Sequence, residues 1–191
     1  MTIHPWEAQP TGQAAVAIER IAQSLPRIAT DRTIMRGPYI EDFDIYAGIV
    51  MSDRGAHVSG QRTRAGAWDD FLQLTASWIL RGAGLWTVEA QIDKSVLGFV
   101  LLGHETGDPE PELSFFFTAE AEGQGYAFEA ARAARNNAWN ALSWEKLISY
   151  IEPGNTRAIR LAERLGAAPD PSADHDGTLA YRYPRPEIPE M

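Results

Sequence analysis

Gly123 and Gly125 lie at the end of a loop, Ala119–Gly125 (AEAEGQG), that joins an aromatic strand to a predicted helix. Because these positions have no side chains, the free backbone N–H groups at the start of the helix stay open to a ligand. The positive end of the helix dipole adds to their attraction for an anion. This spacing suits a pyrophosphate. A tight strand-to-helix turn uses the same two glycines, so the pair alone leaves both interpretations open.

A second candidate site lies in the stretch Ile148–Gly166 (ISYIEPGNTRAIRLAERLG). Here a short strand is ended by Pro-Gly-Asn, and the helix that follows carries three arginines. Those arginines could bind phosphate groups, although three arginines on a short helix are also typical of a solvated face. The side chains of interest are Asn155, Arg157, Arg160 and Arg164.

Four further side chains could move protons. Glu112 opens the aromatic strand ELSFFF, and Ser114 lies two residues on, so both belong to the same face of that strand. His104 ends the preceding strand, and an imidazole titrates near neutral pH, as a general base should. Tyr150 lies on the strand before Pro153. Each also has an ordinary structural explanation, as a strand-end carboxylate, a turn residue or a core hydrogen bond.

The hydrophobic periodicity predicts the framework that must position these residues. Helical and strand-like patterns give the order helix, strand, two helices, an antiparallel hairpin with a third strand, and then β-α-β-α-β. This order is typical of a mixed α+β domain in three layers, with a central twisted sheet flanked by helices. The expected helices are 11–25, 41–51, 67–80, 119–141 (entered through its glycines) and 155–165, and the expected strands are 33–36, 85–90, 95–102, 112–118, 147–152 and 178–183.

Two details of this framework can be checked against a structure. Helix 67–80 is expected to place most of its large apolar residues on one side, namely Trp68, Phe71, Leu72, Trp78 and Ile79. The polar, glycine-bearing stretches 52–66 and 167–177 are expected to be loops, and loops of this kind commonly shape a substrate pocket.

Composition narrows the function further. The chain has 191 residues, 45% of them hydrophobic, so one domain (26–184) is expected, with an N-terminal helical extension (1–25) and a C-terminal tail (185–191). The net charge of −9 argues against binding to nucleic acid or to an anionic membrane. With no cysteine and four scattered histidines, no metal site is expected. Without a secretory or membrane-spanning pattern, a cytoplasmic protein is expected.

Together, the glycine loop and the Pro-Gly-Asn segment resemble the GNAT superfamily of acetyl-CoA-dependent N-acetyltransferases. The loop is similar to that family's Gln/Arg-x-x-Gly-x-Gly/Ala motif, and Asn155 begins a segment similar to its N-x-x-A/S motif. The similarity covers roughly residues 26–183, and the branch that fits best is the ribosomal-protein N-terminal acetyltransferases. The opening and hairpin motifs of that branch are matched by Thr30, Arg32, Ile34, Arg36, Glu41 and Asp42, and by Leu97, Gly98, Phe99 and Val100.

The resemblance implies the GNAT fold and acetyl-CoA as the acyl donor, with pantetheine entering where strands 112–118 and 147–152 separate. Backbone amides around the glycine loop would bind the pyrophosphate, Asn155 would bind the pantetheine or phosphate region, and an arginine of the last helix would reach the 3′-phosphate. The residues implied to bind acetyl-CoA are Phe117, Thr118, Glu122, Gly123, Gln124, Gly125, Tyr126, Asn155, Arg157 and Arg160.

The resemblance also implies transfer of an acetyl group to a primary amine, either the N-terminal α-amine of a protein or a small amino compound. Glu112 is the expected base, because that branch often has a glutamate there, and Ser114 is expected to orient the acceptor or the thioester. His104 is a second candidate base, and Tyr150 is a candidate proton donor. A homodimer is a further option that the sequence leaves open.

Three departures from the family pattern keep other functions open. Glu120 stands where the loop motif has Gln or Arg, while Ala158 and Ala162 stand where family members often have the serine or tyrosine that protonates the leaving thiolate. One alternative is therefore a GNAT-fold protein that binds acyl-CoA as a sensor or inactive partner. The other is a small α+β interaction module with an incidental Gly-x-Gly.

Overall fold

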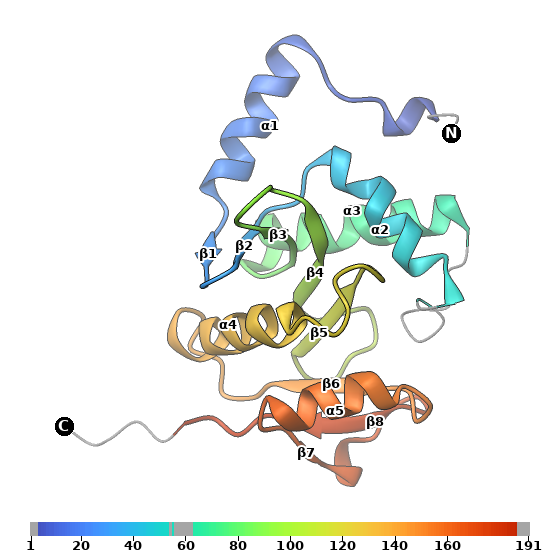
Figure 1. Cartoon of the computed structure of the whole chain (residues 1–191), viewed down its shortest axis with the longest axis vertical. Coiled ribbons are helices and arrows are strands. Elements are labelled where there is room, and N and C mark those ends of the chain that lie inside the picture. The colour runs from blue at the N-terminus through green and yellow to red at the C-terminus, as the bar shows by residue number, and fades with distance from the viewer. Residues whose placement is uncertain (1–3, 54, 56–62, 187–191) are drawn as a thin grey trace, which may run out of the picture.

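The computed structural model describes residues 4–53, 55 and 63–186, which form a central sheet between two layers of helices (Figure 1). The strand order is β1-β2-β3-β4-β5-β6-β8-β7, and every neighbouring pair is antiparallel except β5 and β6, which are parallel. The strands are β1 (Ile28–Ala29), β2 (Thr33–Arg36), β3 (Leu85–Ala90), β4 (Val96–Gly103), β5 (Glu112–Phe117), β6 (Ile148–Ile151), β7 (Ala168–Pro169) and β8 (Leu179–Arg182).

Each face of the sheet has its own apolar core. On one face α2 (Phe43–Val50) and α3 (Arg64–Arg81) pack against β3, β4 and Phe116 of β5. On the other face α4 (Tyr126–Asn140) and α5 (Thr156–Arg164) pack against Leu113 and the C-terminal strands, and Figure 1 shows both helices in front of the sheet. Because side chains alternate along a strand, β5 contributes to both cores at once.

The sheet separates between β5 and β6, as the sequence predicts. β5 pairs with β4 from Glu112 to Phe117, but it pairs with β6 only at Glu112 and Ile148. Side chains take over part of the lost pairing, because the Ser149 hydroxyl donates to the carbonyl of Leu113 and the Glu112 carboxylate accepts the Tyr150 N–H at 3.0 Å. These bonds hold the two strands at the point where they part.

Most expected elements are present, with shifts at their ends. The predicted helix 41–51 begins as the 3-10 turn η2 (Ile40–Asp42), and α3 begins earlier than the predicted helix 67–80 because Thr63 caps it, accepting the Gly66 N–H at 3.1 Å. The two-residue strands β1 and β7 were not expected. The predicted loop 52–66 falls largely on residues 54 and 56–62, outside the described residues.

One expected apolar face is wrong in part. Phe71 and Trp78 of α3 are buried, but Leu72 and Ile79 are exposed, Ile79 at 70%. Both lie about a quarter of a helical turn from the buried stripe, on the side that faces away from the sheet. Local periodicity therefore located the helix but not its contact face.

A buried ion-pair network fixes α2 against the sheet. Arg36 of β2 donates to both carboxylate oxygens of Asp42 at 2.7 and 2.9 Å and to Glu89 of β3 at 2.7 Å. Asp42 also accepts the Thr87 hydroxyl at 2.7 Å. Asp42, expected only as part of a family motif, therefore connects α2 to two strands.

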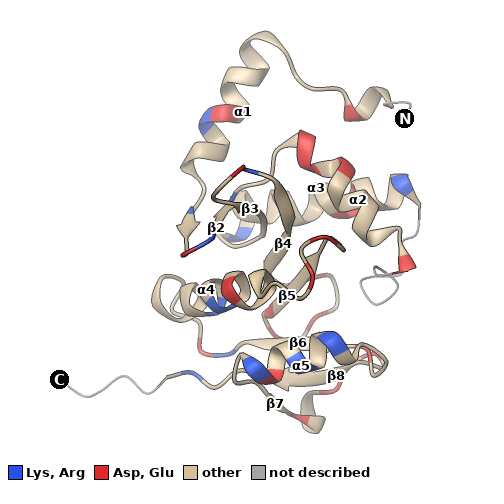
Figure 2. Ribbon diagram, in the orientation of Figure 1, with Lys and Arg blue, Asp and Glu red and all other residues tan. Residues whose placement is uncertain are grey.

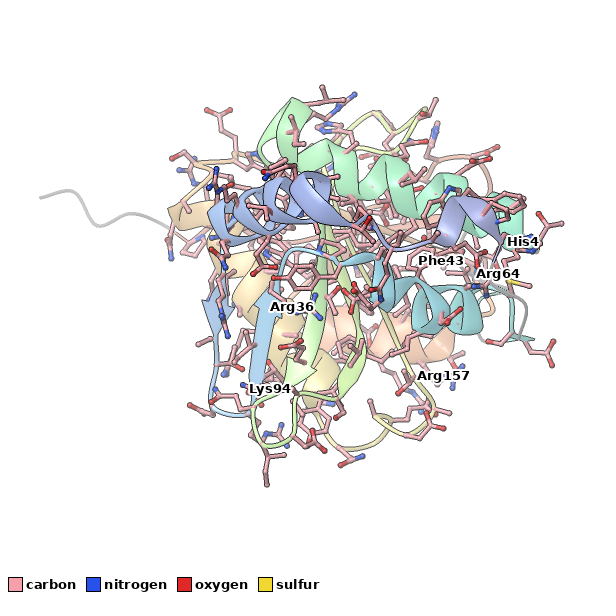
Figure 3. The ribbon with its side chains drawn as sticks, turned by 90° about the horizontal axis from the view of Figure 1, so that it is seen from above. His4, Arg36, Phe43, Arg64, Lys94 and Arg157 are labelled. Atoms are coloured by element: carbon pink, nitrogen blue, oxygen red, sulfur yellow. The ribbon has the colours of Figure 1, made fainter. Side chains whose placement is uncertain are left out.

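The N-terminal extension contacts the same end of the molecule. Glu7, in the 3-10 turn η1 (Pro5–Glu7), binds Arg64 of α3 through two bonds of 2.6 and 2.9 Å, and the Arg64 guanidinium lies 4.7 Å from the Phe43 ring centre. Figure 3 shows His4, Phe43 and Arg64 gathered there. α1 (Gly12–Ser24), by contrast, has no buried residue. No helix among the described residues is long and apolar enough to cross a membrane.

Candidate active site

A groove of about 920 Å³ lies between β5, the start of α4 and α5. It combines the glycine loop with the arginine-bearing helix, two segments that are well separated in sequence. Aromatic side chains of β5 form its inner part, and polar side chains form its rim. Its lining includes Phe115, Phe117, Glu122, Gly123, Gln124, Gly125, Phe128, Asn155, Arg157, Ala158, Arg160 and Arg164.

The backbone of the glycine loop has a conformation that favours glycine. Gly123 has φ +72° and Gly125 has φ +82°, and Gly125 is the N-cap of α4. A side chain at Gly123 would meet no other atom within 4 Å, so this position opens directly to the groove. The first N–H groups of α4 have no acceptor within the helix. Together these features form a cradle of donors for an anion.

Arg32 holds the loop in place. Its Nη1 donates to the Gln124 carbonyl at 2.9 Å, and its guanidinium pairs with Glu129 of α4 at 2.8 Å and lies 4.7 Å from the Tyr126 ring centre. Although burial would raise it, the hydrogen bonds from Thr30 and Arg32 hold the pKa of Glu129 below its ordinary value. Because Arg32 binds the Gln124 carbonyl, the glycine loop is held in one conformation where it lines the groove.

Three arginines of α5 line the groove, and one of them is paired with a carboxylate of the glycine loop. Arg157 of α5 forms an ion pair with Glu122, which counters the carboxylate that stands beside the expected pyrophosphate position. Arg160 and Arg164 also line the groove, and the Arg164 guanidinium lies 4.8 Å from the Phe128 ring centre. Figure 2 shows basic positions along the α5 ribbon and acidic positions in the loop before α4.

The other expected donor-site residues differ in position. Phe117 lines the groove with its side chain. Thr118 and Tyr126 do not line it: the Thr118 N–H donates to Leu97 at 2.9 Å, and Tyr126 packs against a small apolar cluster beneath the loop. Asn155 lines the groove but caps α5, because its Oδ1 accepts the Ala158 N–H at 3.1 Å. Tyr126 can therefore contribute its backbone N–H to the cradle, but not its side chain.

A second cavity of about 310 Å³ adjoins the groove. The two cavities share Phe115, Phe116, Asn155 and Ala158, which lie where β5 and β6 separate. The groove lies on the α4 side of β5, while Glu112 and Ser114 share the opposite face with Phe116. A ligand that entered the groove could thus reach the second cavity through the gap in the sheet.

Glu112 is the central polar group of the second cavity. It is 6% exposed, and its carboxylate accepts the Tyr150 N–H at 3.0 Å. Burial and the nearby Glu105 raise its pKa to about 8, which the bonds from Tyr150 and Ser114 only partly offset. A carboxyl group that titrates so close to neutral pH is suited to accept a proton from a substrate.

Two carboxylates in this cavity were not singled out from the sequence. Glu105 and Asp108 belong to the turn-rich connection between β4 and β5, and the Glu105 N–H donates to Asp108 at 2.8 Å. Burial, followed by repulsion from Asp108 and Asp70, raises the pKa of Glu105 to about 7. The only sequence signal was the presence of acidic residues shortly before Glu112.

Hydroxyl groups surround the same cavity. Ser114, Ser149 and Tyr150 line it, and Ser149 shares a 3.0 Å hydrogen bond with Tyr183. The hydroxyl oxygen of Tyr150 is shielded from solvent and has no hydrogen-bond partner among the described residues. His104 lines neither cavity, so the structure does not bring it together with Glu112. No group of three potential metal ligands occurs in the described part of the chain.

Residues 32–168, well over half of the chain, match the family model for the acetyltransferase (GNAT) domain. The chain belongs to the GNAT acetyltransferase family. A crystal structure of an acetyltransferase from Agrobacterium tumefaciens strain C58 is 32% identical, with a TM-score of 0.80 over 84% of this chain and 95% of that one. The predicted family, fold and class of enzyme are confirmed at this level.

Two other matches are weaker: one has lower sequence identity, and the other covers a shorter segment. The ribosomal-protein-S5-alanine acetyltransferase from Vibrio fischeri is 13% identical, with a TM-score of 0.64 over 84% of this chain and 97% of that one, and so shares the fold. The uncharacterized protein YkkB of Bacillus subtilis (strain 168) is 40% identical over 55 residues, which are 29% of this chain and 32% of that protein. This match therefore spans about a third of the relative's length.

The two alanines that depart from the family pattern, Ala158 and Ala162, lie in different surroundings. Ala162, on the inner side of α5, is fully buried in the core and lines neither cavity. Ala158 lies at the junction of the two cavities, where a serine would face the site. The hydroxyl-bearing residues of β5 and β6 that line the second cavity are Ser114, Ser149 and Tyr150.

Proposed function

We propose that this protein transfers the acetyl group of acetyl-CoA directly to a primary amine, with Glu112 as the general base. The observation that carries the proposal is the junction of the two cavities at the gap between β5 and β6. A donor in the groove and an amine in the second cavity would meet there, beside a buried carboxylate.

The groove suits acetyl-CoA, the donor that GNAT enzymes use. The backbone amides from Gly123 to Tyr126 would hold the pyrophosphate, because the loop and the start of α4 form an ordered cradle. The expected amide of Glu122 is not free for this, since it donates to the Ala119 carbonyl at 3.2 Å. Arg157, Arg160 or Arg164 would bind the 3′-phosphate. These local donors explain how a chain with a net charge of −9 could bind a polyanion.

The chemistry requires two proton movements. The amine nitrogen forms a bond to the acyl carbon and loses one proton, while the carbon–sulfur bond breaks and the sulfur takes up one proton. Glu112 would take the first proton, with its raised pKa close to that of an α-amine near ~8 and well below that of a lysine near ~10.4. Such a base would suit an amine of lower pKa best.

Tyr150 would supply the second proton. Tyr150 lines the second cavity, its hydroxyl oxygen has no hydrogen-bond partner among the described residues, and burial raises its pKa, so the hydroxyl stays protonated. Ser114, on the same strand face as Glu112, would orient the amine or the thioester carbonyl. His104, outside both cavities, would have no direct part in this scheme.

The acceptor would be a protein N-terminal α-amine or a small amino compound. The most direct test is release of CoA from acetyl-CoA across a panel of amines, together with calorimetry of acetyl-CoA binding. Amine-dependent CoA release supports the proposal. Binding of acetyl-CoA without CoA release from any amine would favour the acyl-CoA sensor, which the alanines at 158 and 162 also allow.

A further inference from the structure

We propose that Arg32 is a positioning residue for the acyl donor, because it turns the Gly125 N–H toward the groove before the pyrophosphate of acetyl-CoA arrives. The inference rests on the proposed function, since it takes acetyl-CoA as the ligand of the groove. It goes further by assigning a part in acyl-donor binding to a side chain that does not itself line the groove.

The direction of the Gly125 N–H follows from the bond between Arg32 and Gln124. Nη1 of Arg32 donates to the Gln124 carbonyl at 2.9 Å. In a planar trans peptide unit, a carbonyl and the N–H of the next residue point in opposite directions. Gln124 and Gly125 line the groove, whereas Arg32 does not. The N–H that points away from Arg32 therefore points to the side of the groove.

The N–H groups of the glycine loop have no partner inside the protein. No described residue accepts a hydrogen bond from the backbone N–H of Gly123, Gln124 or Gly125. Glycine has the most freely moving backbone of all residues, so a loop with two glycines loses much conformational entropy when a ligand orders it. A contact that orders the loop beforehand removes this cost from binding.

Arg32 is itself fixed on every side. Its backbone N–H donates to Glu129 at 2.7 Å, and its carbonyl accepts the Gln91 N–H at 2.8 Å. Its Nε donates to Glu129 at 2.8 Å, and its guanidinium lies 4.7 Å from the Tyr126 ring centre. Glu129 is buried and also accepts the Thr30 hydroxyl at 2.5 Å. These contacts give the guanidinium one orientation, as a positioning group requires.

The guanidinium also packs directly against the start of α4. A Cβ atom built at Gly125, the N-cap of this helix, would lie only 3.4 Å from Nη2 of Arg32. A guanidinium is planar and carries donors on separate edges, so Arg32 binds the Gln124 carbonyl and the Glu129 carboxylate at the same time. A lysine has its donors on a single nitrogen and cannot reproduce this fork.

The first test is calorimetry of CoA binding, which needs no acceptor. We expect Arg32→Ala to weaken CoA binding about tenfold or more, the scale of ordering the backbone of one residue. Arg32→Lys keeps the charge but not the fork, and should recover little of that loss. Arg64→Ala is the matched control, because Arg64 also pairs with a buried glutamate and lies 4.7 Å from an aromatic ring centre, but lines neither cavity.

A shorter acyl donor separates positioning from general damage to the site. S-Acetylpantetheine carries the thioester but lacks the pyrophosphate, so it makes no use of the cradle. With the same amine acceptor, the loss of kcat/KM that Arg32→Ala causes should be about tenfold larger for acetyl-CoA than for S-acetylpantetheine. Equal losses with the two acyl donors would overturn the inference, because the variant would then have disturbed the whole site.

The outcomes separate the inference from the proposed function. Parent-like CoA affinity in Arg32→Ala, or full recovery in Arg32→Lys, would overturn the inference and leave acetyl transfer standing. If no amine released CoA, acetyl transfer would fail, and calorimetry would still decide the inference. A parent protein that binds no CoA would overturn both. If thermal unfolding shows that Arg32→Ala is not folded, Arg32→Lys decides: weaker CoA binding supports the inference, and parent-like binding overturns it.

Discussion

The 920 Å³ groove proposed for the donor (the donor groove) and the 310 Å³ cavity proposed for the acceptor (the acceptor cavity) meet at one gap in the sheet, yet their charged groups differ in arrangement. Around the groove, two arginines are paired with carboxylates of the protein: Arg32 binds Glu129 and the loop, and Arg157 binds Glu122. In the acceptor cavity, Glu105 and Glu112 have no cation beside them within the described residues, and both have raised pKa values.

This difference indicates what each side does. An ordered groove with paired charges can bind the same donor in every cycle at little conformational cost. A cavity with unpaired carboxylates is less stable when empty, but it can take protons and attract cations. The carboxyl groups whose pKa values are raised by burial thus lie in the acceptor cavity, where the proposed reaction requires a base.

The largest expected effect is on turnover. Glu112→Gln keeps the size of the side chain and an oxygen for the Tyr150 N–H, but it cannot accept a proton. We expect kcat at neutral pH to fall by roughly 10²–10⁴-fold, with the affinity for acetyl-CoA unchanged. CoA release and calorimetry measure the two quantities. Full activity at neutral pH would move the base role to another group, such as His104 or a water.

The next effect should appear only on the donor side. Gly123→Val would place a branched side chain over the amide cradle, and we expect acetyl-CoA affinity to fall by about 100-fold or more. Gly82→Val is the matched control, because Gly82 has φ +71° and open space around it, like Gly123 with φ +72°, but lines neither cavity. Both variants carry the same backbone strain, so equal loss of affinity would contradict the cradle.

A third effect concerns stability. The pKa of Glu112 is raised from 4.5 in the unfolded chain to about 8 in the fold, so the folded state binds the proton more tightly. This contribution to stability is present below pH 4.5 and is lost as pH rises toward 8. Glu112→Gln should therefore gain stability over the parent on the order of a few kcal/mol by pH 8 and match it near pH 4. Denaturant unfolding at the two pH values would show whether the gap opens.

The smallest effect should come from the exposed ion pair on the groove. Glu122→Gln removes a carboxylate beside the pyrophosphate position, and we expect acetyl-CoA affinity to rise about two- to fivefold. Arg157→Ala should lower it by a similar factor, because Glu122 would then lack this partner. Opposite changes in the two dissociation constants support the assignment, whereas changes of the same sign would not.

The two sides also differ in how far the sequence predicted them. The glycine loop, the arginine helix and the separation of β5 from β6 all depend on local patterns, and the structure contains each of them. The role of Arg32 depends on a contact with Gln124, 92 residues away, which no local pattern shows. Sequence analysis therefore predicted the segments that line this groove but not the contact that orders the glycine loop.

The acceptor cavity was less predictable. Glu112 and Tyr150 were expected in the site and line one cavity, whereas His104 was expected there and does not. Glu105 and Asp108 lie in a connection rich in turns, and its course is set by tertiary contacts such as the pair between Glu110 and Arg182. The packing side of α3 and the short strands β1 and β7 depend on distant partners for the same reason.

The central claim is that a buried Glu112 takes the proton from an amine beside the donor groove. The pH dependence of kcat/KM for acetyl transfer, measured for the parent protein and Glu112→Gln with the same amine, tests it most directly. The parent should show a rise in activity that levels off near pH 8, where Glu112 becomes ionised. The variant should lack that rise and approach the parent only as the amine itself deprotonates. Two profiles of the same shape would contradict the account.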